Sequence, residues 1–142
     1  MTSWIDLHKI FVDIKGDFIH VVNDSSESLE KILIEHNFSV YKINGNKIFD
    51  EETFFKEVAQ VFGFPAYFGN NWAAWDDSLG DFGNLAPNNV AIIWEGSGQT
   101  FISDEQLFLQ AICDLYNLAA VFATPQYFVK SDKKQIEVFI LK

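Results

Sequence analysis

The feature that most constrains the fold is an unbroken apolar run at residues 90–94, Val-Ala-Ile-Ile-Trp. A strand without a polar position has no face suited to water, so it belongs in a sheet that is covered on both faces. Residues 138–141, Val-Phe-Ile-Leu, form a second such run. The segment between the two carries apolar residues at helical spacing, and a helix between two buried strands favours a right-handed crossover with parallel pairing.

Earlier segments fit the same scheme. Residues 40–43 are typical of a short strand. Asp50 suits the N-cap of a helix, and the apolar residues after it recur every 3.6 residues until Gly63 ends the pattern. A second helix is predicted over residues 70–79.

The segments that follow the first apolar run are less regular. Residues 96–99, Gly-Ser-Gly-Gln, lack the lysine of a phosphate-binding loop and are interpreted as the exit of the strand. Ser103, with Gln106 three positions later, is predicted to open a helix that continues to Leu115. Residues 118–123 either prolong this helix or leave it.

The first 36 residues are predicted to form an extension. Residues 8–14 and 18–22 are strand-like and flank Lys15-Gly16-Asp17, which suits a hairpin turn. Asp24, with Glu27 three positions later, predicts a capped helix that stops near Asn37. At 142 residues, the chain is long enough for one good core.

We therefore predict a single α/β domain over residues 1–142, with a two-layer core at residues 37–142. In this core a small parallel sheet is packed by helices. Residues 1–36 are expected to add strands and a helix at an edge of the sheet.

Charge limits the partners of this protein. Twenty acidic residues, ten lysines and no arginine give a formal net charge of −10. Such a surface repels phosphates, and the planar donor fork of arginine is missing, so direct binding of nucleic acid is not expected. In most acidic proteins the negative charge serves only to keep the protein soluble; the functional alternative is a basic protein partner.

Other site chemistries receive little support. Cys113 is the one cysteine, which excludes an intramolecular disulfide. His8, His20 and His36 lack ligand-like spacing, so we expect no metal site. We also expect no cofactor and no catalytic residue. No apolar run approaches the roughly 20 residues of a membrane span, and the cytoplasm is the expected compartment.

The segment at residues 65–79 carries the functional signal. Two aromatic residues and Gly69 lead directly into the predicted helix. At about 100° per residue, the large apolar side chains lie on one side of that helix, and these are Trp72, Trp75 and Leu79. The other side is small and acidic, with Asp76 on its flank, and it contains Asn70, Ala73, Ala74, Asp77 and Asp81.

Two properties of this second side favour contact with another protein. Asp77 and Asp81 lie late in the helix, where the negative end of the helix dipole disfavours carboxylates, so their presence suggests an electrostatic role. The small side chains of Ala73 and Ala74 would also let another protein approach the backbone closely.

The same segment resembles the signature of the barstar family of ribonuclease inhibitors. In that signature a proline, an aromatic pair, glycine, asparagine, an apolar residue and two spaced acids precede a leucine. The order of elements over about the last hundred residues is similar as well. The resemblance implies a non-enzymatic immunity protein that places acidic side chains in the active-site cleft of a basic ribonuclease or related nuclease toxin.

The resemblance also implies a set of partner-binding residues. Tyr67 corresponds to the tyrosine that stacks on the partner, Asp77 to the central acid, and Asp114 to a further acid on a later helix. Phe82 corresponds to an aromatic at the end of the helix. The full expected set is Tyr67, Phe68, Gly69, Asn70, Asn71, Trp72, Ala73, Asp76, Asp77, Asp81 and Asp114.

One departure leaves two functions open. Ala73 stands where the family commonly has another aspartate, so one expected phosphate mimic is missing. Two alternatives follow. In the first, the chain inhibits a nuclease different from the one that barstar inhibits. In the second, the chain is a barstar-fold interaction module without inhibitory activity. A hydrolase that uses Asp77 and Asp114 as paired carboxylates is a distant third alternative.

Overall fold

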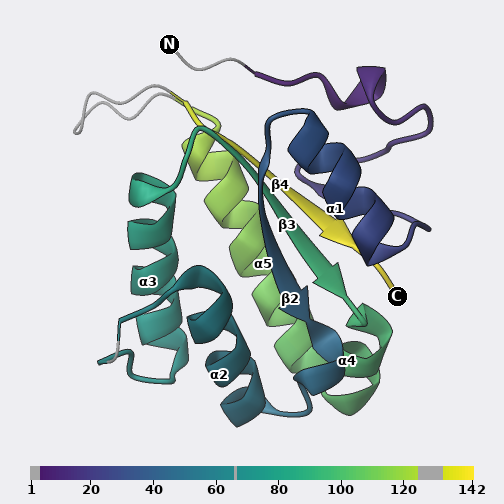
Figure 1. Ribbon diagram of the computed structural model, residues 1–142. Helices are drawn as coiled ribbons and strands as arrows, with labels where there is room; N and C mark the ends of the chain where they lie inside the picture. The colour runs from purple at the N-terminus through teal and green to yellow at the C-terminus, as the bar shows by residue number, and fades with distance from the viewer. Residues whose placement is uncertain (1–3, 66, 125–132) are drawn as a thin grey trace.

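The computed structural model describes residues 4–65, 67–124 and 133–142, which form a parallel four-stranded sheet with helices on both faces (Figure 1). The strand order is β1-β4-β3-β2. The strands are β1 (Ile19–Val21), β2 (Ser39–Asn44), β3 (Asn89–Glu95) and β4 (Gln135–Ile140). All six residues of β4 and the middle five of β3 are buried, which confirms that the two apolar runs are inner strands of a parallel sheet.

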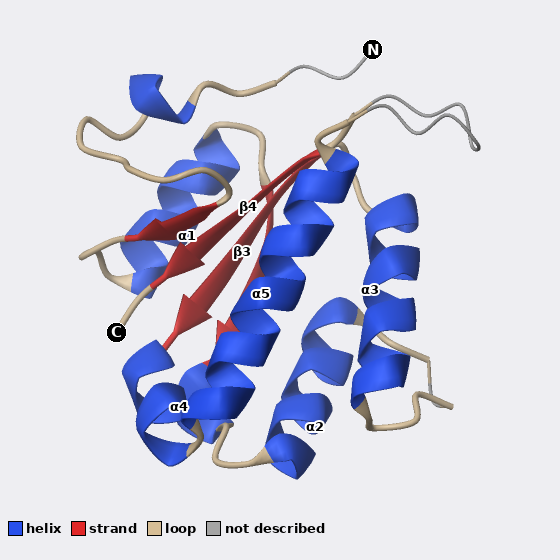
Figure 2. Ribbon diagram, turned by 180° about the vertical axis from the view of Figure 1, so that it is seen from behind, coloured by secondary structure: helices blue, strands red, loops and turns tan. Residues whose placement is uncertain are grey.

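The helices are α1 (Ser26–Glu35), α2 (Glu51–Phe62), α3 (Trp72–Leu85), α4 (Ser97–Ser103) and α5 (Glu105–Phe122). Short 3₁₀ helices cover Leu7–Lys9 and Gly45–Lys47. Helices α2, α3 and α5 pack on one face of the sheet, and α1 lies on the other, as the two opposite views show (Figures 1 and 2).

Alternate side chains of β3 feed these two layers. Val90, Ile92 and Trp94 enter the core beneath α2, α3 and α5. Ala91 and Ile93 enter the core beneath α1. The predicted α/β class, with a small parallel sheet packed by helices, is confirmed. The N-terminal segment adds β1 at an edge as expected, and it also covers the second face through α1.

The predicted N-terminal hairpin is wrong. Residues 8–14 contain the end of a 3₁₀ helix and irregular backbone, and β1 pairs with β4 in parallel rather than with a neighbouring strand. Gly16 and Phe18 both have positive φ angles, 82° and 69°, and turn the chain onto the edge of β4. The edge of β4 offered unpaired backbone groups, and these outweighed the local turn signal.

Four boundaries also differ from the prediction. The helix predicted over residues 70–79 begins at Trp72 and continues to Leu85, so Asp77 lies at its middle and not late in it. The N-cap of α1 is Ser25 rather than Asp24, with Ser25 Oγ accepting a hydrogen bond from Ser28 N at 3.1 Å. The predicted strand exit at residues 96–99 instead begins α4. The N-cap of α5 is Asp104 rather than Ser103. Residues 118–122 prolong α5, which settles the alternative left open by the sequence.

The caps of α2 agree with the sequence. The Asp50 side chain accepts a hydrogen bond from Thr53 N at 2.9 Å. In return, Thr53 Oγ1 accepts a hydrogen bond from Asp50 N at 3.1 Å. Gly63 ends the helix in the left-handed conformation, with a φ of 68°. Glycine adopts that conformation without the steric cost that a Cβ atom brings. This turn fixes where the loop toward α3 leaves the core.

A buried polar network ties the N-terminal segment to β4. His20 Nε2 lies 2.9 Å from Glu137 Oε1, and His20 Nδ1 lies 2.8 Å from the carbonyl oxygen of Lys15. Gln135 Nε2 donates to Glu137 Oε2 at 3.0 Å and to the carbonyl oxygen of Ile5 at 2.8 Å. His20 therefore takes part in a buried hydrogen-bond network, which its sequence position did not indicate.

The protonation of His20 follows from its neighbours. A carbonyl oxygen and a carboxylate oxygen both accept hydrogen bonds, so both ring nitrogens donate when the imidazole is charged. Burial by itself would lower the pKa of His20, but the hydrogen bonds to Glu137 and Lys15 and the charges of Glu137 and Asp17 outweigh it and raise the pKa above 6.5.

We expect the stability of the protein to depend on this histidine in a defined pH window. Because the folded pKa is raised, the stabilisation is fully present below the unfolded pKa of 6.5 and is lost as pH rises through the folded pKa. The free energy of unfolding in urea should therefore fall above pH 6.5 more steeply in the wild type than in His20→Gln. The exposed His8→Gln variant is the control, and equal pH slopes in the wild type and His20→Gln would contradict the assignment.

Candidate functional site: the exposed face of helix α3

The loop before α3 is fixed by one asparagine. Asn71 is the N-cap of the helix, and its Oδ1 accepts a hydrogen bond from Ala74 N at 2.8 Å. Its Nδ2 donates to the carbonyl oxygen of Gly69 at 3.1 Å. Asn70, between them, has a positive φ of 51°. Asn71 therefore positions both the first turn of α3 and the backbone of the preceding loop.

The inner side of α3 is anchored by two tryptophans. Trp75 is fully buried, and its ring packs edge-on against Phe54 with centroids 5.1 Å apart. Trp72 is half-buried, stacks on Phe54 at 5.6 Å, and donates from Nε1 to Glu51 Oε1 at 3.0 Å. Trp72 was expected to contact a partner, and its ring instead faces α2, so only part of it is available.

The outer side of α3 is open to solvent. Ala73, Asp76, Asp77 and Asp81 are all exposed, as is Asn70 before the helix. We call these five residues the acidic face. Within the described part of the chain the ion pairs are Lys42–Glu30 and His20–Glu137, so neither Asp77 nor Asp81 is neutralised by an ion pair there. The acidic face thus offers free carboxylates on a rigid helix.

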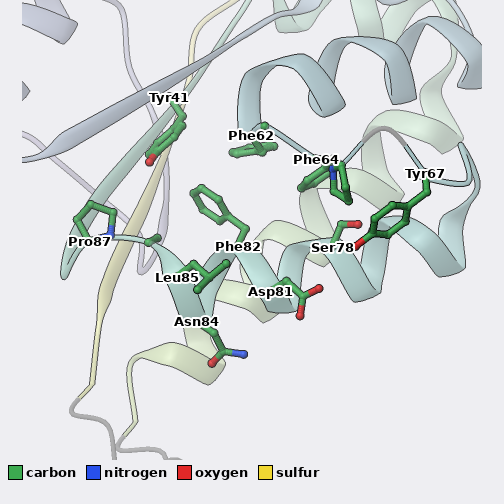
Figure 3. A pocket seen from close by; sticks show the side chains of 13 residues that line it. Tyr41, Phe62, Phe64, Tyr67, Ser78, Asp81, Phe82, Asn84, Leu85 and Pro87 are labelled. Carbon is green, nitrogen blue, oxygen red and sulfur yellow. The ribbon is translucent and has the colours of Figure 1, made fainter.

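The aromatic pair before the helix is divided between the surface and the core. Tyr67 is 87% exposed and points from the loop over α3, toward Ser78 and Asp81 (Figure 3). Phe68 is half-buried and packs against Phe64 and Phe55, with centroids 5.0 Å and 6.1 Å away. Of the two, Tyr67 is the one free to contact a partner, and Phe68 holds the loop in place.

Asp114 lies beside the acidic face but is already engaged. Its Oδ2 accepts a hydrogen bond from Trp75 Nε1 at 2.9 Å, and its Oδ1 accepts one from Gln110 Nε2 at 3.0 Å. With Asp76 it lines a groove of about 300 Å³ between α3 and α5. Partial burial, followed by the charges of Asp114 and Asp77, raises the pKa of Asp76.

Lys134 holds the C-terminal end of α3, a contact that the sequence did not indicate. Its Nζ donates to three backbone carbonyl oxygens, those of Gly83, Asn84 and Ala86, at 2.8–2.9 Å. Burial lowers the pKa of Lys134. A cation at this end offsets the negative pole of the helix dipole, and so reduces the cost of keeping Asp81 in the last turns.

A second groove, of about 490 Å³, adjoins the acidic face (Figure 3). We call it the aromatic groove. It runs between α3, the loop that follows α2 and the strand β2. The sequence did not indicate this groove, because its walls come from separate elements; they include Tyr41, Phe62, Phe64, Tyr67, Asp81, Phe82 and Leu85.

A metal site finds no support in the described residues, where no three His, Cys, Asp or Glu side chains gather to hold an ion. The hydrolase alternative also lacks support, because the groove beside Asp114 is lined by Asp76 and not by Asp77. Within the described segments, no helix is both long and apolar enough to cross a bilayer.

The site combines an acidic helix face with a tyrosine-bearing loop on a parallel α/β scaffold. In a comparison with protein families, the model described as barstar (barnase inhibitor) matches residues 38–140. The chain belongs to the barstar family. The match begins next to β2, so residues 1–37 lie outside it. A search of curated proteins found no match.

We expect Asp114 to stabilise the fold and Asp77 not to. Asp114→Ala leaves the Trp75 N–H without its acceptor and should lower the free energy of unfolding by about 1–3 kcal/mol. Asp114→Asn keeps an acceptor oxygen and should cost less. Asp77→Ala, on the open side of the helix, should stay within about 0.5 kcal/mol of wild type. Urea unfolding followed by tryptophan fluorescence measures all three.

A second measurement tests the electrostatic interaction between Asp114 and Asp76. Loss of the Asp114 charge should bring the raised pKa of Asp76 closer to its ordinary value, although the contribution of burial remains. Carboxyl NMR titration of Asp76 measures the change. An unchanged Asp76 pKa in Asp114→Asn would show that the two carboxyls do not interact.

Proposed function

We propose that this chain inhibits a basic ribonuclease-type nuclease by seating the acidic face of α3 over the active site of the enzyme. The observation that carries the proposal is the free Asp77 carboxylate, exposed at the middle of a helix that is anchored from its inner side by Trp75 and at its ends by Asn71 and Lys134. A rigid carboxylate of this kind can occupy the position of a substrate phosphate.

The shape of the face supports close approach. Ala73 and Ala74 carry small side chains and Gly80 carries none, so a partner can reach the backbone around Asp77. Tyr67, beside them, provides a large exposed ring for stacking on a partner. Affinity in such interfaces is concentrated in a few residues, and we place Asp77 and Tyr67 among them.

Long-range attraction accounts for the encounter. A protein with a net charge of −10 is drawn to a nuclease whose active site binds phosphates with basic side chains. The chain acts in this proposal as an immunity protein for its partner and carries out no catalysis itself. Of the residues expected from the sequence, we propose that Tyr67, Gly69, Asn70, Asn71, Ala73, Asp76, Asp77 and Asp81 contact the partner directly. Phe68, Trp72 and Asp114 make contacts within the protein and contribute mainly by holding this surface in place.

The alternative is a barstar-fold interaction module without inhibitory activity. The exposed Ala73, in a position where the family commonly has an aspartate, favours it. Because Asp114 is engaged by Trp75 and Gln110, it does not straightforwardly replace the missing charge.

The direct test is titration of purified protein against basic ribonucleases and co-expression with the product of the neighbouring open reading frame, scored for rescue from toxicity. We expect stoichiometric inhibition of at least one enzyme. Asp77→Arg should then weaken the complex at least about thirtyfold, because loss of one partner of a close charge pair costs about 2–5 kcal/mol.

The matched control is Asp24→Arg, which makes the same change of charge at an exposed residue before α1. Both variants should keep the wild-type circular dichroism spectrum, since neither side chain is buried. If both weaken inhibition equally, net charge rather than the acidic face is responsible. If no nuclease is inhibited while the protein still captures one, the interaction-module alternative holds.

Association should also depend on salt. We expect the association rate constant with the inhibited nuclease to fall at least about tenfold between 0.05 and 0.5 M NaCl, as ions screen the attraction between the two proteins. Dissociation should change much less. Stopped-flow fluorescence measures both rates, and an association rate that ignores salt would contradict electrostatic steering.

A further inference from the structure

The aromatic groove has a floor of ring faces and edges. Phe62 and Phe82 are buried and pack against each other with centroids 4.8 Å apart. Tyr41 meets Phe82 edge-on at 5.0 Å, and Phe64 stacks beside Phe62 at 5.8 Å. Tyr67 stands at the rim (Figure 3). Aromatic faces carry negative electrostatic potential, so this floor favours a cation as well as apolar groups.

The aromatic groove carries negative charge. Asp81 is the charged residue among the described residues that line it, and the polar lining residues Ser78 and Asn84 are neutral. Asp81 is exposed, so it can accept hydrogen bonds from an incoming group. The complementary ligand has an apolar stem for the rings and a positive head for Asp81.

We propose that the aromatic groove binds an arginine side chain of the partner nuclease, a step that rests on the function proposed above. A guanidinium group is planar, is more weakly hydrated than an ammonium group, stacks on aromatic faces and pairs with a carboxylate through two N–H donors. Lysine meets these requirements less well.

The source of the arginine follows from the sequence and the geometry. This chain contains no arginine, so neither an intramolecular segment nor a second copy can supply one. Asp81 belongs to both the acidic face and the aromatic groove. A basic protein that is seated on the acidic face therefore brings its own arginines to the rim of the groove.

The test uses the full-length, isotope-labelled protein and a small probe, N-acetyl-arginine N-methylamide, followed by NMR. We expect saturable shifts at Tyr67, Asp81 and Leu85. The citrulline analogue has the same shape without the charge and should bind more weakly. Asp81→Asn should weaken arginine binding about two- to fivefold, as expected for an exposed charge pair. Asp24→Asn is the control and should bind like wild type.

Three outcomes would overturn the groove proposal. They are no saturable shift in the groove, equal binding of the arginine and citrulline probes, and tighter binding of N-acetyl-phenylalanine N-methylamide than of the arginine probe. Shifts at Tyr67 and Leu85 that grow with protein concentration alone would assign the groove to a second copy and overturn it as well.

The titration needs no nuclease, so the two proposals can fail separately. If the probe does not bind while a nuclease is still inhibited, the groove proposal fails and the inhibitory function stands. If the probe binds but no nuclease is inhibited, the proposed function fails, and with it the nuclease as the source of the arginine.

Discussion

The double-sided burial of β3 is the constraint on which the rest of the structure depends. Val90, Ile92 and Trp94 require a helical layer on one face, and Ala91 and Ile93 require another on the opposite face. The first layer brings α3 onto the sheet with its two tryptophans inward. The acidic side of α3 is consequently directed to solvent, and the candidate interface is a by-product of how the core is filled.

The acidic face combines features that separately cost stability. Asp81 lies in the second half of α3, toward the negative end of the helix dipole, and the alanines leave backbone uncovered. Asp77 lies at the middle of α3, because the helix continues to Leu85, so the dipole does not disfavour it in the way that the shorter predicted helix implied. The cost is offset elsewhere, by the Asn71 cap, by the hydrogen bond between Trp75 and Asp114, and by Lys134 at the helix end. These contacts give α3 a single orientation, which is what a preorganised binding surface requires.

Local signals predicted most of the fold, and contacts between distant residues account for what they missed. The strands β3 and β4, the Asp50 cap and the end of α2 follow from short stretches of sequence. The pairing of β1 with β4 joins residues more than a hundred positions apart, so the nearby Lys15-Gly16-Asp17 turn was misleading. The side of α3 that is exposed was predictable from periodicity. The engagement of Asp114, the role of Lys134 and the aromatic groove required the three-dimensional structure.

Helix α1 of the N-terminal segment and the acidic face of α3 can change independently in sequence. Ile5 pairs with the side chain of Gln135, and α1 lies across the sheet from α3. A partner on the acidic face is therefore separated from α1 by the whole thickness of the sheet. Substitutions on the exposed side of α1 can alter the stability of the scaffold, and substitutions on α3 can alter the choice of partner, with little interference between the two.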